Sequence, residues 1–391
     1  MADPLAYLDQ QLRQLESQGL RTRLRVLDGE QLPVAVFDGR RVINLSSNNY
    51  LGLATHPALR AAAEKAVRTL GVGSGAVRTI TGTMRSHVEL ETRIARFKQT
   101  EAAIVFQSGF TANAGVVAAV LGREDTIISD ELNHASIIDG ARLSRAAIKV
   151  FPHRDVAAAD RLLAEVTSGH KLLITDGVFS MDGDIAPLPA LCELAERHGA
   201  IMMVDDAHAS GVLGRNGRGT VDHFGLHGRV HIQVGTLSKA IGALGGYIAG
   251  SQSLIEWLQL RGRPFLFSTS HPPAVTAACL AAFDVLENEP ERIERLWSNT
   301  RRFKLGLQAA GFNIGASETP ITPVMVGEGR RAMEFSRALF DAGVLATGIA
   351  FPTVPEGKAR LRTIVTATHT DDDLDKALEI FQRVGKAQGI L

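Results

Sequence analysis

The chain has 391 residues, of which 45% are hydrophobic and 21% are charged, as in an ordinary globular protein. Lysine plus arginine number 42 and aspartate plus glutamate also number 42, so no net charge attracts the chain to nucleic acid or to an anionic membrane. An anion that the protein binds must therefore be held by a local site.

The sequence carries no sign of export or of membrane insertion. Cys192 and Cys279 are far apart and form no disulfide framework, which favours a reducing compartment. Residues 1–16 mix acidic, basic and apolar side chains and lack the apolar stretch of a signal peptide. No apolar run reaches membrane-spanning length. We therefore expect a cytoplasmic protein with no membrane or nucleic-acid partner.

The N-terminal part and the long middle part of the chain differ in pattern. Residues 1–55 are expected to form an N-terminal arm with a helix over 4–18 and a β-rich segment over 33–45. Residues 56–285 alternate between helical segments and short apolar runs, and are expected to form a large domain. The predicted strands of this domain are 102–106, 126–129, 147–151, 171–176, 200–205, 231–236 and 246–249. Continuously apolar strands separated by helices predict a mostly parallel sheet covered on both faces.

Residues 286–391 are expected to form a smaller C-terminal α/β domain. A long helix over 290–310 leads into strands over 321–326 and 359–366, and the last helix covers 371–388. The predicted fold class is therefore α/β, with a large, mostly parallel sheet domain and a smaller α/β domain.

Polar residues follow the predicted strands at the carboxyl edge of the sheet, where ligands of such sheets bind. Asp205, Asp206 and His208 come after the strand 200–205. Asp205 can hydrogen-bond a protonated pyridine nitrogen, and His208 can reach a neighbouring phenolic oxygen. Two carboxylates at a strand end are also typical of a magnesium site, and a helix cap with a core histidine is a plainer alternative.

Lys239 follows the strand 231–236. A lysine at the end of an apolar strand is costly unless its charge is paired or used. Lowered basicity is also what a lysine needs to form a Schiff base with a carbonyl. Thr236 and Ser238 lie close enough in sequence to donate to a phosphate. The spacing of a P-loop is absent, and a surface lysine is the remaining alternative.

Two more strand ends carry candidate groups. Gly109 and Phe110 open a helix after the strand 102–106, where free backbone N–H groups can bind an anion. His134 opens a helix after the strand 126–129, where its ring can stack on a planar cofactor or cap the helix. An aspartate and a lysine at neighbouring strand ends, beside an anion-binding turn, fit a cofactor with a ring nitrogen, an aldehyde and a phosphate. The combination predicts pyridoxal phosphate (pyridoxal 5'-phosphate), and no HExxH or CxxC motif supports a metal site.

The chain resembles the α-oxoamine synthases, which are fold-type I pyridoxal-phosphate enzymes, over nearly its whole length. The segments that carry the resemblance are NLSSNNYLG at 44–52, LNHASIIDG at 132–140, TDGVFSMDG at 175–183 and ARLR at 359–362. Within the family these segments look closest to glycine C-acetyltransferases and nearly as close to 8-amino-7-oxononanoate synthases.

The resemblance implies roles for particular residues. Lys239 would bind the cofactor covalently, Asp205 would pair with its ring nitrogen, and His134 would stack on its ring. The other residues implied to hold the cofactor are Ser180 and His208 at the phenolic oxygen, Gly109, Phe110 and Thr236 at the phosphate, and Ser268 and Thr269 at the phosphate of the neighbouring subunit. The last pair implies a homodimer with shared active sites.

The resemblance also implies a substrate site. Arg362 would bind the carboxylate of the amino acid, because a guanidinium fork suits that group. Asn49, His134, Thr353 and Arg21 would also contact the substrate, Arg21 with the least support.

The expected reaction condenses glycine with acetyl-CoA to give 2-amino-3-ketobutyrate and CoA, as in threonine degradation. Lys239 would remove the α-proton, and the cofactor would delocalise the resulting carbanion. The alternatives are an enzyme of biotin synthesis that joins L-alanine to a pimeloyl thioester with loss of carbon dioxide, or an enzyme that accepts both pairs. An aminotransferase is a further alternative within catalysis, and a cofactor-binding protein without turnover is the alternative from another class.

Overall fold

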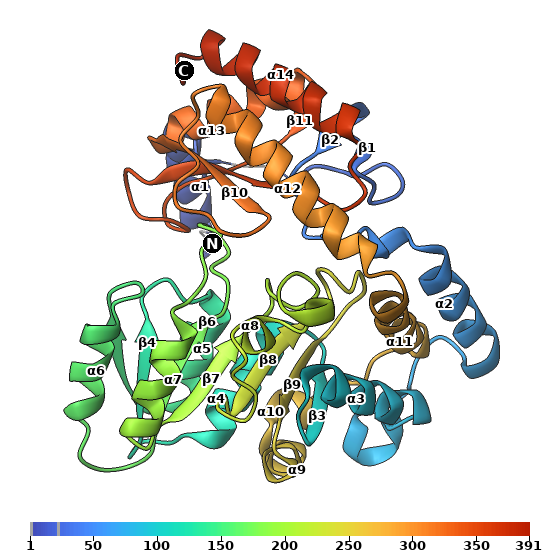
Figure 1. The fold of residues 1–391 in the computed structure, drawn as a ribbon, viewed down its shortest axis with the longest axis vertical. Coiled ribbons are helices and arrows are strands. Elements are labelled where there is room, and N and C mark those ends of the chain that lie inside the picture. The colour runs from blue at the N-terminus through green and yellow to red at the C-terminus, as the bar shows by residue number, and fades with distance from the viewer. Residues whose placement is uncertain (1–2, 22–23) are drawn as a thin grey trace. The chain divides into compact units, whose positions relative to one another are not determined.

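The computed structural model describes residues 3–21 and 24–391 (Figure 1). The chain forms two compact units, described separately below. Unit 1 comprises Met1–Ser47, Met181–Gly183 and Arg295–Leu391, and unit 2 comprises Asn48–Ser180 and Asp184–Glu294. The division into three domains at residues 55 and 285 stays a prediction.

Unit 2 is built on a seven-stranded sheet with the strand order β3-β9-β8-β7-β6-β4-β5 (Figure 1). The strands are β3 (Ala102–Phe106), β4 (Thr126–Asp130), β5 (Ala147–Phe151), β6 (Lys171–Asp176), β7 (Ile201–Asp205), β8 (Ile232–Thr236) and β9 (Gly246–Gly250). Strand β9 pairs antiparallel with both β3 and β8, and the remaining pairs are parallel. The carboxyl ends of all strands but β9 therefore lie at one edge of the sheet.

Helices cover both faces of this sheet. The helical elements of unit 2 are η1 (Leu53–Thr55), α2 (Pro57–Leu70), η2 (Arg78–Gly82), α3 (Arg85–Lys98), α4 (Gly109–Val120), α5 (Ala135–Ser144), α6 (Val156–Ala164), α7 (Leu188–Arg197), η3 (Arg215–Gly217), α8 (Thr220–His223), α9 (Gln252–Arg261), α10 (Arg263–Phe267) and α11 (Pro273–Asn288). One apolar cluster joins the sheet to α4, α5, α9 and α10, and a second cluster joins it to α6, α7 and α8.

The strand residues divide between these two clusters by simple alternation. Ile127 and Met203 pack in the cluster with α4 and α5, whereas Ile128 and Met202 pack in the cluster with α6 and α7. Successive side chains of a strand point to opposite faces, so a strand buried on both faces must be apolar throughout. The continuous apolar character of the sequence has this physical cause.

Unit 1 contains two small sheets. The first has the order β1-β2-β11 and the second β10-β13-β12. Their strands are β1 (Val34–Phe37), β2 (Arg40–Asn44), β10 (Ile321–Gly327), β11 (Val344–Leu345), β12 (Thr347–Ile349) and β13 (Ala359–Ile364), and the helices are α1 (Tyr7–Ser17), α12 (Glu291–Ala309, which begins in unit 2), α13 (Gly329–Asp341) and α14 (Asp371–Ala387).

The α/β fold class expected from the sequence is confirmed. All seven strands predicted for the large sheet are present, with bounds that differ by at most one residue. The N-terminal helix is shorter than predicted, since it begins at Tyr7 rather than at residue 4. Among the described residues no helix combines the length and the apolar character needed to cross a bilayer.

His153 forms an ion cluster with two buried carboxylates, Asp130 and Asp184, near the carboxyl end of β4. His153 Nδ1 lies 3.0 Å from Asp130 Oδ1, and His153 Nε2 lies 2.7 Å from Asp184 Oδ2. Burial lowers the pKa of His153, but the hydrogen bonds to both carboxylates and their charges outweigh it and raise this pKa to about 9. The folded state therefore binds the proton of His153 more tightly than the unfolded state does.

The pKa of His153 predicts a pH-dependent contribution to stability. A pKa raised from 6.5 to about 9 stabilises the fold fully below pH 6.5, and the contribution disappears as the pH rises through 9. We expect His153→Gln to lower the free energy of unfolding by about 3 kcal/mol near pH 6. The gap to the wild type should close by pH 10. Thermal melts of the wild type and His153→Gln between pH 6 and pH 10 measure this difference in stability. His170→Gln, on an exposed loop, is the control. A gap that does not change with pH would contradict the assignment.

Candidate active site

Two adjacent parallel strands of unit 2 deliver the principal groups of the site. Asp205 is the last residue of β7 and pairs in register with Val234 of β8. Strand β8 ends at Thr236, and Lys239 follows three residues later. Asp205 is 4% exposed, whereas Lys239 is half-buried. The sheet thus places a desolvated carboxylate and a partly accessible amine at neighbouring strand ends, as predicted.

A hydrogen-bonded chain leads from Lys239 into the core. Lys239 Nζ lies 2.8 Å from His208 Nε2, and His208 Nδ1 lies 2.8 Å from the hydroxyl of Tyr50. Tyr50 is 1% exposed and its ring meets that of His208 edge-on. Tyr50 therefore holds the imidazole so that Nε2 faces the amine.

A second chain runs from Asp205 to His134. Asn113 Nδ2, on α4, donates to Asp205 Oδ2 at 2.6 Å and to Ser136 Oγ at 2.9 Å. Ser136 Oγ lies 2.7 Å from His134 Nδ1. Burial lowers the pKa of His134, which favours the neutral ring.

The carboxylate of Asp176, at the end of β6, fixes the turn that carries His134. Its Oδ2 accepts a 2.9 Å hydrogen bond from the backbone N–H of His134. Burial, followed by the charge of Asp205, raises the pKa of Asp176 well above its usual range. Asp205 and His134 are thus anchored on three neighbouring elements of the same sheet edge.

The first turn of α4 forms a candidate anion site. Ser108 caps the helix, and its Oγ accepts from the backbone N–H of Thr111. The N–H groups of Gly109 and Phe110 precede it, in the part of a helix where no intrahelical acceptor exists. A β-carbon on Gly109 would lie 3.7 Å from Thr236 Oγ1, so this turn and the end of β8 face each other. The side chain of Phe110 is 46% exposed.

Ser180 is half-buried four residues beyond β6, and Asn49 is buried with its Oδ1 accepting from the N–H of Ala54. Ser268 is half-buried and Thr269 is exposed, directly after α10. The carbonyl of Thr269 accepts a 2.8 Å hydrogen bond from Gln107, which adjoins the anion turn.

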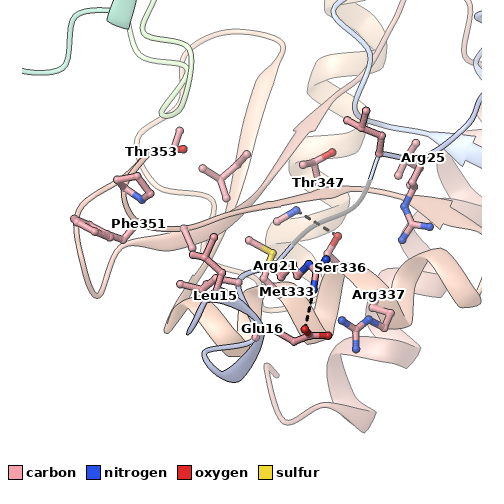
Figure 2. Close-up of a pocket in the computed structure, with 18 residues that line it drawn as sticks. Leu15, Glu16, Arg21, Arg25, Met333, Ser336, Arg337, Thr347, Phe351 and Thr353 are labelled. Atoms are coloured by element: carbon pink, nitrogen blue, oxygen red, sulfur yellow. Dashed lines mark hydrogen bonds and ion pairs between the residues drawn. The ribbon is translucent and has the colours of Figure 1, made fainter. Parts of the chain in front are cut away.

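The three predicted substrate residues of unit 1 lie in or beside one cavity. Figure 2 shows this cavity, which measures about 1120 Å³ and is lined by α1, α13 and the segment 345–353. Arg21 and Thr353 line it directly. Arg362 stands on β13 opposite Thr347 of β12, which also lines the cavity, so both side chains leave the sheet on the same face.

The charges of this cavity are unequal. Arg21 Nη1 pairs with Glu16 at 2.8 Å, and Arg25 Nη1 pairs with Asp38 at 3.3 Å. Arg337 lines the same cavity and has no carboxylate partner in residues 3–21 and 24–391. The four residues outside those ranges are Met, Ala, Thr and Arg, none of which is acidic.

Comparison with known proteins gives the family. The family model "Aminotransferase class I and II" matches residues 40–381. The chain is 60% identical over 387 residues to an 8-amino-7-oxononanoate synthase of Symbiobacterium thermophilum, covering 98% of this chain and 99% of the relative. It belongs to the α-oxoamine synthases within this aminotransferase family. The cofactor of the family is pyridoxal phosphate, as the sequence predicted.

Other relatives agree. An 8-amino-7-oxononanoate synthase 1 of Bacillus subtilis is 55% identical, covering 100% of both chains. A solved serine palmitoyltransferase of S. paucimobilis, described with a bound PLP–myriocin aldimine, superposes with a TM-score of 0.95 at 34% identity over 100% of both chains.

The expected condensation of glycine with acetyl-CoA is wrong, and the link to threonine degradation is unsupported. The relatives at 55–60% identity are named 8-amino-7-oxononanoate synthases. The physical reason for the error is that the roles expected of Lys239, Asp205 and His134 are the same for both activities, so these residues do not distinguish the two acyl groups. The residues that select the acyl group lie in other parts of the chain, so the motifs at the strand ends do not predict which acyl group is used.

Sequence reasoning missed three residues of the site. Asn113 was not singled out, and Ser136 in LNHASIIDG and Tyr50 in NLSSNNYLG were given no role. A polar side chain inside an otherwise apolar helix, such as Asn113 in α4, is the signal that could have found the first. The others become visible only when packing shows their partners.

The geometry predicts that Lys239 carries the cofactor. Borohydride reduction of the loaded protein followed by peptide mapping should place pyridoxal phosphate on Lys239, because its amine faces the site. Lys239→Ala should lose both the label and the visible absorbance, whereas Lys358→Ala, an exposed control in unit 1, should keep them. A label on another lysine would refute the assignment.

Proposed function

We propose that this protein is a pyridoxal-phosphate acyltransferase that condenses L-alanine with a pimeloyl thioester to give 8-amino-7-oxononanoate, carbon dioxide and the free thiol. The observation that carries the proposal is full-length identity of 55–60% to relatives of that name. The cavity of unit 1 supports it, because about 1120 Å³ greatly exceeds the room that an acetyl group needs.

The residues of unit 2 fit pyridoxal phosphate. A buried carboxylate at Asp205 suits a protonated ring nitrogen, and the helix turn at Gly109 beside Thr236 suits a phosphate. When bound, the cofactor delocalises negative charge that develops on the α-carbon of the amino acid. Lys239 would hold the cofactor and would accept the α-proton of the amino acid at its Nζ, and His134 would contact the cofactor ring.

The other cofactor contacts follow from the same placement. His208, held by Tyr50, and Ser180 serve the phenolic oxygen, while Gly109, Phe110 and Thr236 hold the phosphate. Ser268 and Thr269 reach the phosphate of a second subunit, so the active form is a homodimer. Both cysteines are free and buried, which is consistent with a cytoplasmic protein.

The substrates divide between two sets of residues. Arg362 binds the carboxylate of alanine as a guanidinium fork, and Asn49 and His134 contact the amino acid. Thr353 and the apolar wall of the unit 1 cavity, which includes Leu20, hold the acyl chain.

The far carboxylate of the pimeloyl chain explains the charge of that cavity. Figure 2 shows Phe351 and Thr353 together at one end and Arg337 towards the other. Arg21 is already paired with Glu16, whereas Arg337 has no acidic partner in the described parts of the chain. A second carboxylate brought by the substrate balances this excess of positive charge, and a neutral acyl chain does not.

The reaction is tested by thiol release from the loaded enzyme with L-alanine and pimeloyl-CoA, with Lys239→Ala as control. We expect CoA and carbon dioxide in equal amounts. An aminotransferase would instead convert alanine to pyruvate in the presence of a keto acid and release no CoA. No CoA release from any long acyl thioester would overturn the proposal.

The role of Arg337 predicts a change of acyl preference. Arg337→Met should raise KM for pimeloyl-CoA by about three- to tenfold and leave KM for octanoyl-CoA, which lacks the carboxylate, nearly unchanged. Arg330→Met on the same helix is the matched control, because Arg330 does not line the cavity and lies 3.9 Å from Glu334. Equal effects on both thioesters would contradict a carboxylate-binding role.

A further inference from the structure

One polar chain links the buried carboxylate at the end of β7 to the exposed histidine at the start of α5. Its four members are Asp205, Asn113, Ser136 and His134, joined by distances of 2.6, 2.9 and 2.7 Å. Asn113 is fully buried, and Ser136 and Asp205 are 1% and 4% exposed. Buried hydrogen bonds of this kind are strong, and a broken one is costly.

The chemistry of the groups fixes the direction of every bond. An ionised carboxylate only accepts, so the side-chain nitrogen of Asn113 must face Asp205, and an amide oxygen at 2.6 Å would be repelled. The opposite atom, Asn113 Oδ1, is buried and finds no partner among the described residues. The orientation of the Asn113 amide therefore satisfies both N–H donors of Nδ2 and leaves the acceptor Oδ1 without a partner among the described residues.

His134 Nδ1 is the acceptor at the end of this chain. The backbone N–H of Ser136 donates to His134 Nδ1 at 3.2 Å, and a backbone N–H cannot accept, so Nδ1 carries no proton. Ser136 Oγ accepts from Asn113, and its own proton is then directed at the same Nδ1. The neutral ring of His134 therefore carries its proton on Nε2, which remains available as a donor.

The fold brings the two helices close enough for this chain. A β-carbon on Gly140 of α5 would lie 2.8 Å from the carbonyl oxygen of Asn113, so only glycine permits this approach of α5 to α4. Ser136 lies one turn earlier on α5 and so reaches the side chain of Asn113. The LNHASIIDG segment thus contains both the histidine and the glycine that positions it.

We infer that Asn113 is a positioning residue: its amide clamps the carboxylate of Asp205 and, through the hydroxyl of Ser136, fixes His134 as the Nε2–H tautomer. The inference deepens the proposed function, since it rests on the roles given to Asp205 and His134. The amide of Asn113 thus couples Asp205, which is proposed to pair with the ring nitrogen of the cofactor, to His134, which is proposed to stack on the cofactor ring. Neither orientation depends on which acyl thioester is used.

The test measures cofactor affinity and the state of His134, not turnover with pimeloyl-CoA. Asn113→Leu keeps the branched shape and the number of heavy atoms but removes both donors, and should raise the dissociation constant for pyridoxal phosphate by about ten- to hundredfold. Ser136→Ala should raise it less. The double variant should cost less than the sum of the two single changes, because both break one chain. Additive effects, or an unchanged dissociation constant in Asn113→Leu, would overturn the coupling.

The tautomer is read from nitrogen-15 spectra of histidine-labelled holoenzyme, with the His134 signals assigned by their loss in His134→Gln. We expect an unprotonated, hydrogen-bonded Nδ1 and a protonated Nε2 in the wild type. Ser136→Ala should shift the Nδ1 signal and Ser136→Thr should restore it. Ser144→Ala is the matched control, because Ser144 is a buried serine of the same helix bonded only to the backbone of Ala141 and Ala146. A protonated Nδ1 in the wild type would overturn the inference even if Asn113→Leu does not fold.

Discussion

The parallel pairing of β7 with β8 is the constraint on which the site depends. It puts Asp205 beside the strand that leads to Lys239, at an edge where the backbone leaves the sheet. Asp205 is 4% exposed, and a buried polar group is costly unless hydrogen-bond partners replace the water it has lost. Asn113 supplies one, and the backbone N–H of Ala207 supplies another to Asp205 Oδ1 at 2.9 Å.

The sheet could be predicted from the sequence because its cause is local. Strands buried on both faces must be apolar throughout, and their ends must be marked by polar residues, as β6 is by Asp176. Lys239, Asp205 and His134 were found in this way. Asn113 and Ser136 could not be assigned roles, since their partners depend on the distance between α4 and α5, which Gly140 sets.

The acyl group could not be predicted for a related reason. The residues that surround the cavity of unit 1 come from two parts of the chain, residues 15–25 and residues 333–353, which lie about three hundred residues apart. No contiguous motif predicts the volume of this cavity, or that Arg337 has no carboxylate partner among the described residues. The residues proposed for the core chemistry, Lys239, Asp205 and His134, lie at or just after strand ends. The proposed acyl specificity depends instead on packing between segments that are distant in the sequence. This separation explains why the family was predicted and the expected substrates were wrong.

We propose that the enzyme joins the α-carbon of alanine to an acyl group and that the amino-acid carboxylate then leaves as carbon dioxide. Turnover of L-alanine labelled with carbon-13 at its carboxyl carbon, with pimeloyl-CoA, tests both steps at once. We expect labelled carbon dioxide in equal amount to CoA and an unlabelled nine-carbon amino ketone. Labelled pyruvate without CoA, or a product that keeps the labelled carboxylate, would contradict it.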